Sequence, residues 1–242
     1  MILEELAALT RNRVAEEKKK IPADEMRRMA ESLPVTGTFP FGKALRTPGL
    51  SFICEVKKAS PSKGLIAPDF PYLQIALEYE QAGASAISVL TEPYRFLGSD
   101  QYLQEIAQSV NIPVLRKDFT VDSYMIDQAK TLGASAVLLI CSILDDGAIR
   151  EYMAQARELG LSALVEAHDA KEVERALAAG ASILGVNNRD LRTFQVDVNN
   201  SVRLRAMVPL EIVFVSESGI RGPEDTKILY ENGTDAVLIG ET

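Results

Sequence analysis

The chain repeats one short pattern four times, at intervals of roughly 50 residues. Residues 81–87 (QAGASAI), 131–137 (TLGASAV) and 178–184 (AAGASIL) are close copies, and residues 231–237 (ENGTDAV) are a weaker one. In each copy a glycine ends a stretch of helical periodicity and precedes a short apolar run, as glycine does just after a helix. The repeat indicates a chain built from equivalent units in which a helix leads into a strand.

Other short apolar runs lie midway between these copies, so each repeat contains two strand–helix units. The apolar runs predict eight strands, near residues 51–57, 86–90, 113–117, 136–140, 162–166, 183–187, 212–216 and 236–240. Short apolar strands that alternate with helices pair in parallel. Eight such units in about 200 residues are typical of an α/β fold of the TIM-barrel type, the (β/α)₈ barrel. A doubly wound open sheet is the competing fold, but the even repeat favours the closed barrel.

The whole of residues 1–242 is expected to form a single barrel domain. Residues 48–242 make the barrel, and residues 1–47 precede the repeat as a helical extension. Apolar residues at helical spacing predict a first helix (Ile2, Leu3, Leu6 and Leu9), and a second is expected from about Ala23 to Leu33. Thr242 directly follows the eighth strand, so the final helix that should cover this strand is expected to be missing.

Composition excludes several classes of function. Hydrophobic residues make up 47% of the chain, enough for a large core, and the net charge of -8 argues against a general nucleic-acid binder. A lone histidine, His168, and the lack of a cysteine pair at ligand spacing predict no metal site. Cys54 and Cys141 lie in apolar runs and are expected to be buried, reduced thiols of a cytoplasmic protein. The charged N-terminal residues predict neither a signal peptide nor a membrane span.

Charged residues stand at the ends of the predicted strands, where barrel enzymes carry their reacting groups. Glu55 and Lys57 end the first strand, Lys117 ends the third and Glu166 ends the fifth. Alternate strands share layers inside a barrel, so two ammonium groups and a carboxylate are expected to converge. An unpaired charge in the interior costs several kcal/mol, and a fold does not need one. A site for an anionic substrate does.

This cluster predicts acid–base chemistry. Neighbouring positive charge and partial burial are expected to lower the pKa of one lysine, so that it acts as an acid near neutrality. A structural ion pair is the alternative for any single residue and is a weaker explanation for all of them together. The sixth and seventh strands add the polar residues Asn187, Arg189, Ser216 and Ser218.

Glycine-containing loops after the last two strands predict a phosphate site. Residues 218–225 (SGIRGPED) follow the seventh strand, and residues 239–241 (IGE) end the eighth. Glycine lets backbone N–H groups approach an anion closely, and these two loops commonly bind phosphate in this fold. Two ordinary glycine turns are the alternative.

Apolar residues also gather at the strand ends, where core packing is the default role. They are Pro61, Phe96, Phe119, Leu138, Leu191 and Ile239. Phe96 lies in a loop and is hard to bury in a barrel core, so it fits a flat aromatic substrate better. His168 is expected to have a structural or supporting role.

Together these residues resemble the indole-3-glycerol-phosphate synthase family of tryptophan biosynthesis. The most specific match is residues 55–64 (EVKKASPSKG), and it is supported by residues 114–119 (VLRKDF), 164–168 (LVEAH), 185–191 (GVNNRDL) and 216–220 (SESGI). The resemblance covers nearly the whole chain. It implies a lyase that converts 1-(2-carboxyphenylamino)-1-deoxyribulose 5-phosphate to indole-3-glycerol phosphate, releasing carbon dioxide and water without a cofactor. It implies no nucleic-acid, membrane or obligate protein partner.

The same resemblance implies roles for individual residues. Lys117 is the expected general acid in ring closure and Glu166 the general base in dehydration, while Lys57 holds the substrate carboxylate. Glu55 orients the lysines, Asn187 binds substrate hydroxyls, and Ser60 contacts the substrate. The implied phosphate site is Ser218 with the backbone of Gly219, Gly240 and Glu241, helped by Arg189. The implied apolar contacts are Pro61, Phe96, Phe119, Leu138, Leu191 and Ile239.

Two other hypotheses remain. Phosphoribosylanthranilate isomerase, on a similar barrel, needs a cysteine and an aspartate at strand ends, and the position of Cys54 within its predicted strand speaks against it. A shortened, catalytically idle barrel is motivated by the abrupt end at Thr242, and the intact charged residues argue against it.

Overall fold

A computed structural model describes residues 2–190 and 195–240 and contains a closed barrel of eight parallel strands. The strands are β1 (Ser51–Val56), β4 (Ala86–Leu90), β5 (Val114–Lys117), β6 (Ala136–Ile140), β7 (Ser162–Ala167), β8 (Ile183–Asn187), β9 (Val213–Glu217) and β10 (Ala236–Ile239). The barrel closes because β1 pairs with both β4 and β10. The predicted (β/α)₈ fold is therefore confirmed, and the open sheet is excluded.

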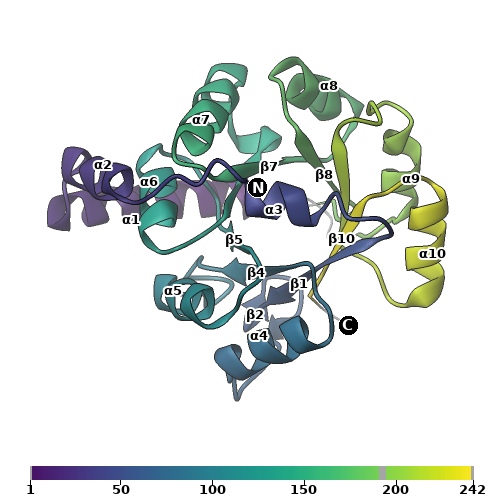
Figure 1. Ribbon diagram of the computed structural model, residues 1–242, viewed down its shortest axis with the longest axis horizontal. Coiled ribbons are helices and arrows are strands. Elements are labelled where there is room, and N and C mark those ends of the chain that lie inside the picture. Colours follow the sequence, from purple (N-terminus) through teal and green to yellow (C-terminus); the bar gives the residue numbers. More distant parts are fainter. Residues whose placement is uncertain (1, 191–194, 241–242) are drawn as a thin grey trace.

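Helices between the strands cover the outside of the barrel (Figure 1). They are α4 (Tyr72–Gln81), α5 (Asp100–Ser109), α6 (Tyr124–Thr131), α7 (Asp146–Glu158), α8 (Ala170–Ala178), α9 (Asn199–Arg205) and α10 (Pro223–Glu231), with a short 3₁₀ turn, η1 (Cys141–Ile143). The repeated glycines 83, 133, 180 and 233 follow α4, α6, α8 and α10 with φ between +83° and +92°. This left-handed conformation favours glycine and ends each helix before the next strand.

Three helices precede the barrel. Helices α1 (Ile2–Lys20) and α2 (Ala23–Ser32) agree with the predicted extension and project from one side, with α2 against α6 (Figure 1). Helix α3 (Pro40–Ala44) was not predicted, because five residues are too few for a periodic pattern. It lies across the face where the strands begin, with the side chain of Phe41 fully buried.

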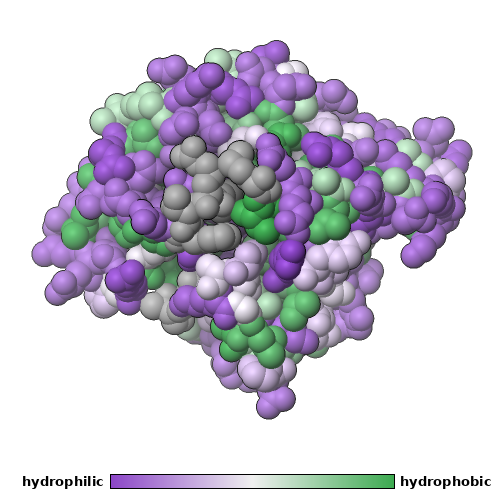
Figure 2. All heavy atoms as spheres, turned by 180° about the vertical axis from the view of Figure 1, so that it is seen from behind, coloured by the Kyte–Doolittle hydropathy of each residue, from purple (hydrophilic) through white to green (hydrophobic). Residues whose placement is uncertain are grey.

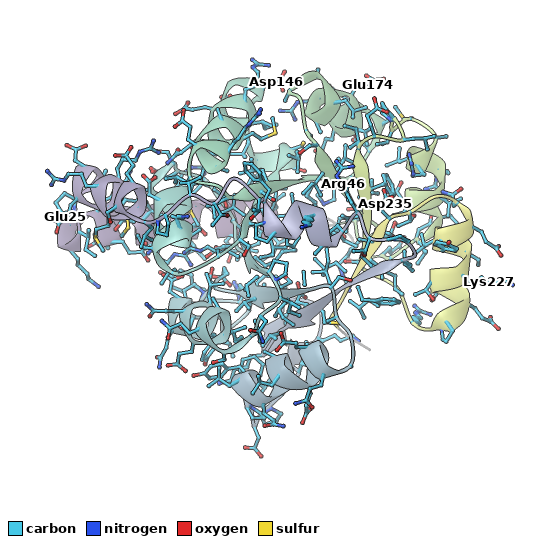
Figure 3. The ribbon with its side chains drawn as sticks, in the orientation of Figure 1. Glu25, Arg46, Asp146, Glu174, Lys227 and Asp235 are labelled. Atoms are coloured by element: carbon cyan, nitrogen blue, oxygen red, sulfur yellow. The ribbon has the colours of Figure 1, made fainter. Side chains whose placement is uncertain are left out.

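Side chains alternate between two apolar layers along every strand, as the pleat of a strand requires. One layer lies between the strands and the surrounding helices, and the other fills the barrel. The interior layer contains, for example, Ile53, Leu115, Leu164, Ile183 and Val213. Charged residues on the helices lie at the rim, as Figure 3 shows for Glu25, Asp146, Glu174 and Lys227. None of the described helices is both long and apolar enough to cross a bilayer.

Helix α1 is fastened to the barrel by buried charge. Arg13 Nη2 donates to Asp118 Oδ2 at 2.7 Å, directly after β5. Asp118 also accepts from Thr91 Oγ1 at 2.5 Å and from the backbone N–H of Phe119 at 2.8 Å. Further along the helix, Lys18 forms a half-exposed pair with Asp122 at 2.7 Å. These contacts hold α1 beside the strand that carries Lys117.

Candidate active site

The carboxyl ends of the strands surround a cavity of about 140 Å³. Every described residue that the family resemblance assigned to the site lines it: Glu55, Lys57, Ser60, Pro61, Phe96, Lys117, Phe119, Leu138, Glu166, Asn187, Arg189, Ser218, Gly219, Ile239 and Gly240. Leu191 and Glu241 lie outside the described residues. Figure 2 shows the face opposite α3, on which hydrophobic side chains lie in several places among hydrophilic ones.

The charged residues reach the cavity because they continue the interior positions of their strands. Glu55 follows Ile53 by two residues, Lys117 follows Leu115, and Glu166 follows Leu164. In each strand the earlier residue belongs to the apolar layer inside the barrel. The period of two therefore directs the charges into the barrel end, while the apolar layer beneath them separates the cavity from the opposite end.

Lys117 lies between two carboxylates. Its Nζ is 3.7 Å from Glu166 Oε2 and 3.7 Å from Glu217 Oε2. Burial by itself lowers the pKa of Lys117, but the charges of Glu166, Glu217 and Glu55 outweigh burial and raise the pKa above its usual range. For Lys117 the expectation of a pKa lowered towards neutrality was wrong, because its near neighbours are carboxyl groups and not cations. Lys117 is an ammonium ion throughout the ordinary pH range.

Glu217 is a site residue that the sequence analysis missed. It ends β9 and follows Val213 and Val215, both interior residues, so the period of two was the signal that could have found it. Burial and the charge of Glu166 raise the pKa of Glu217 to about 8, although Lys117 acts in the opposite direction. The Glu217 side chain is therefore largely protonated at neutral pH.

Gly185 on β8 leaves the space that Glu217 occupies. A Cβ atom built at Gly185 would lie 2.2 Å from Glu217 Oε1 and 3.2 Å from Leu164 Cδ1. Contacts that short do not occur between non-bonded heavy atoms, so any larger residue displaces the carboxyl group. Gly240 has the same relation to Glu55, whose Cβ and Oε1 would each lie 2.7 Å from an added Cβ.

Lys57 and Glu55 form a buried pair on β1 and the residue after it. Their Nζ and Oε1 atoms are 2.9 Å apart, and both side chains are less than 10% exposed. Ser88 Oγ on the neighbouring β4 lies 3.5 Å from the other oxygen of Glu55. Glu55 therefore fixes the Lys57 ammonium at the cavity wall.

Asn187 connects Glu166 to the loop after β8. Its Nδ2 donates to Glu166 Oε1 at 3.2 Å, and its Oδ1 accepts from the backbone N–H of Arg189 at 3.0 Å. The amide orientation follows from these two bonds. Through its bond to Oε1, Asn187 thus fixes the orientation of the Glu166 carboxylate.

Ser218 and Gly219 form a tight turn after β9, with φ of +67° and +81°. A non-glycine residue seldom adopts such a φ value, and such strain concentrates at functional sites. Asn188 supports the turn by donating from Nδ2 to the Ser218 carbonyl at 3.1 Å and to Ser216 Oγ at 3.0 Å. Ser216 is thus buried outside the barrel and is not a lining residue.

Phe96 and Phe119 form the aromatic wall, with ring centroids 6.2 Å apart. Glu92, another residue that the sequence analysis missed, is fully buried beneath Phe96. Its carboxylate accepts the backbone N–H groups of Tyr94, Arg95 and Phe96 at 2.8, 2.8 and 2.9 Å. Glu92 therefore fixes the loop that carries Phe96.

The two cysteines are free thiols away from the cavity. Cys54 is only half-buried and packs in the apolar layer towards the helices, and Cys141 is buried at the start of η1. Burial raises the pKa of both thiols, that of Cys141 to about 12. Cys54 therefore lacks the position and the acidity that an isomerase of the competing kind needs.

Comparisons with known proteins give one family. The model of the family described as indole-3-glycerol phosphate synthase matches residues 3–242. A protein of that name from Ruminiclostridium cellulolyticum is 56% identical, and the match covers all of this chain and 93% of that protein. One from Endomicrobium trichonymphae is 54% identical with the same coverage. A solved structure, the N-acetylmannosamine-6-phosphate 2-epimerase from Clostridium perfringens, has a TM-score of 0.60 at 14% identity, over 78% of this chain and 86% of that one. This last likeness concerns the fold alone.

Proposed function

Because this chain belongs to the indole-3-glycerol phosphate synthase family, we infer that it catalyses that family's reaction, and we propose roles for the cavity residues. The chain is a carboxy-lyase of tryptophan biosynthesis. It converts 1-(2-carboxyphenylamino)-1-deoxyribulose 5-phosphate to indole-3-glycerol phosphate, carbon dioxide and water. The observation that carries the residue roles is the Lys117 ammonium 3.7 Å from Glu166.

Ring closure comes first. A carbon of the aromatic ring attacks the substrate carbonyl, a carbon–carbon bond forms, and negative charge develops on the carbonyl oxygen. Lys117 stabilises that oxygen and gives it a proton. A raised pKa does not prevent this step, because an alkoxide is a far stronger base than an amine. Loss of carbon dioxide then restores electrons to the ring.

Dehydration completes the reaction. The hydroxyl group made in the first step leaves as water, with a proton from a lysine, and Glu166 accepts the proton that the substrate loses. Lys57, paired with Glu55 at 2.9 Å, holds the substrate carboxylate until it leaves as carbon dioxide. Asn187 binds substrate hydroxyls and orients Glu166.

Binding residues fix the two ends of the substrate. Ser218 and the backbone at Gly219 and Gly240 receive the phosphate, with help from Arg189. The aromatic end lies against Phe96 and Phe119, and the remaining apolar and polar contacts come from Ser60, Pro61, Leu138 and Ile239. Anchoring both ends aligns the reacting atoms, which supplies much of the rate enhancement. The reduced thiols fit a cytoplasmic location.

Lys117→Ala tests the assigned acid. Indole fluorescence follows turnover of the synthetic substrate, and we expect kcat to fall by about 10²–10⁴-fold with little change in KM. Lys227→Ala, on the exposed face of α10, is the matched control and should stay within about twofold of the unsubstituted chain. Normal kcat in Lys117→Ala would remove the assignment, and absence of turnover in the unsubstituted chain would contradict the activity.

A further inference from the structure

His168, the single histidine of the chain, lies between two carboxylates. Its Nε2 atom is 3.3 Å from Glu166 Oε1, and its Nδ1 atom is 3.1 Å from Glu172 Oε2 on α8. The ring is largely buried. His168 follows Glu166 by two residues along the chain. Nε2 makes no hydrogen bond of good geometry, so its contact with Glu166 is one of charge, and only an imidazolium carries a positive charge between the two carboxylates.

Glu172 is a fixed anchor for the ring. Its Oε1 accepts from Ser142 Oγ at 2.7 Å, and its Oε2 accepts the backbone N–H of His168 at 2.8 Å. Burial tends to raise the pKa of Glu172, but the hydrogen bonds from His168 and Ser142 outweigh burial and lower it. The anchor is therefore anionic, and it aligns the ring towards Glu166.

The charges around the ring are predominantly negative. Carboxylates face it from two elements, Glu166 on β7 and Asp169 and Glu172 at the start of α8, and the carboxyl group of Glu217 on β9 faces it too but is largely protonated at neutral pH. Among the cations nearby, Lys117 pairs with Glu166, and Arg189 and Arg203 line the adjoining cavity together with Asp190 and Asp197. This excess of carboxylates favours a protonated ring.

We propose that His168 is a positioning residue whose imidazolium, anchored by Glu172, holds the Glu166 carboxylate ionised and oriented as the base. His168 keeps both of its protons during turnover and acts only through Glu166. The proposal rests on the proposed function, because it requires Glu166 to be the base.

The titration behaviour of the ring agrees with its geometry. Burial lowers the pKa of His168, but the hydrogen bond with Glu172 and the charges of Glu166, Glu172 and Glu217 outweigh burial and raise it. The ring therefore keeps its second proton to a higher pH than a solvent-exposed histidine does.

Nuclear magnetic resonance tests the pair without turnover. In a tag-free chain the only histidine gives a single ring Cε1–H signal, whose shift is followed against pH. We expect a midpoint above about 6.5, lowered by about one pH unit in Glu172→Gln and again in Glu166→Gln. A midpoint at or below the ordinary value, or one that neither substitution changes, would overturn the proposal.

The pH profile of kcat tests the consequence for catalysis. His168→Asn keeps a hydrogen-bond donor and removes the charge, and losing a cation beside a buried carboxylate favours the neutral carboxyl group. On the acid limb, the low-pH side of the profile where kcat falls, we expect the midpoint to move to higher pH by about one unit. At a given pH on this limb kcat then drops by about tenfold, with little change at alkaline pH. A loss that is uniform across pH indicates a merely structural role and contradicts the proposal. Lys227→Ala removes an exposed charge on α10 and is the control, so its acid limb should stay in place.

Chemical rescue covers the case in which His168→Asn folds poorly. The ring adjoins a cavity of about 490 Å³ that Ser142, Glu172 and Asn200 also line, so His168→Gly leaves room for free imidazole. Added imidazole should restore kcat on the acid limb, and no restoration in a folded variant counts against the proposal. If the unsubstituted chain shows no turnover, the proposed function fails, and if Glu166→Gln retains kcat, the base role of Glu166 fails and this inference fails with it. If Glu166→Gln loses kcat but His168→Asn leaves the limb in place, only this inference fails.

Discussion

Glu217 Oε2 lies 3.7 Å from Lys117 Nζ, the same distance that separates this ammonium from Glu166 Oε2. One cation thus faces two buried carboxyl groups, and the interior does not readily accept both as anions. The proton that Glu217 retains up to a pKa of about 8 resolves this excess of negative charge. This proton makes the stability of the fold depend on pH.

Glu217→Gln should change how stability depends on pH. The pKa of Glu217 rises from 4.5 in the unfolded chain to about 8 in the folded one, so between these values the native state binds a proton that the unfolded state lacks. Stability therefore falls as pH rises through this window. We expect the unsubstituted chain to lose on the order of 2 kcal/mol relative to Glu217→Gln between about pH 5 and about pH 8. Urea unfolding across this range measures the difference, and parallel stability curves would show the assignment to be wrong.

Gly185→Ala should impair catalysis through Glu217. The added methyl group would lie 2.2 Å from Glu217 Oε1 and must displace it. Displacing a group beside the reacting atoms by about 1 Å can cost about 10²-fold in rate, so we expect kcat to fall by about that factor. Gly42→Ala in α3 is the matched control, because its new Cβ would meet Ile183 Cδ1 at 3.4 Å, an ordinary contact distance. Unchanged kcat in Gly185→Ala would mean that Glu217 can move without consequence.

Glu92→Gln should weaken substrate binding rather than the chemical step. A glutamine keeps one of the two acceptor oxygens, so at least one of the three loop N–H groups loses its partner and the Phe96 loop shifts. An unsatisfied buried donor costs about 1–3 kcal/mol, which corresponds to an increase in KM of about tenfold with kcat nearly constant. Steady-state kinetics separates the two constants. Arg95→Ala breaks only the exposed pair with Glu5 and should barely change KM, and a kcat effect in Glu92→Gln as large as its KM effect would refute the loop-positioning role.

Arg13→Ala should destabilise the attachment of α1 to the barrel. Asp118 has a fully buried side chain and would lose its closest cation while it keeps Thr91 Oγ1 and the Phe119 N–H. Breaking a buried pair costs about 3–5 kcal/mol, and the retained hydrogen bonds place the expected loss near 2–3 kcal/mol. Lys18→Ala breaks the half-exposed pair with Asp122 and should cost less than about 1 kcal/mol. Urea midpoints of the two variants test this order, and equal losses would contradict it.

The barrel and most of its cavity could be predicted because they follow local rules. Glycine after a helix and the period of two along a strand are readable in the sequence, and they place Lys117 and Glu166 at interior strand ends. The charge environment of Lys117 could not be read in this way, because Glu217 lies about 100 residues further along the chain and the fold alone brings them together. Glu217 itself stands between Ser216 and Ser218, in a segment that was matched to the family without giving Glu217 a role. Glu92 was missed because its partners are backbone N–H groups, which carry no residue-specific signal.

The position of helix α3 affects how substrate and products enter and leave the cavity. Among the described residues, α3 and its fully buried Phe41 cover the end of the barrel where the strands begin. Molecules therefore enter and leave at the carboxyl ends of the strands. Substrate, carbon dioxide, water and the indole product then share one passage, and a new substrate enters only after the previous product has departed. Product should accordingly inhibit in competition with substrate, and the speed at which the passage empties sets a ceiling on turnover.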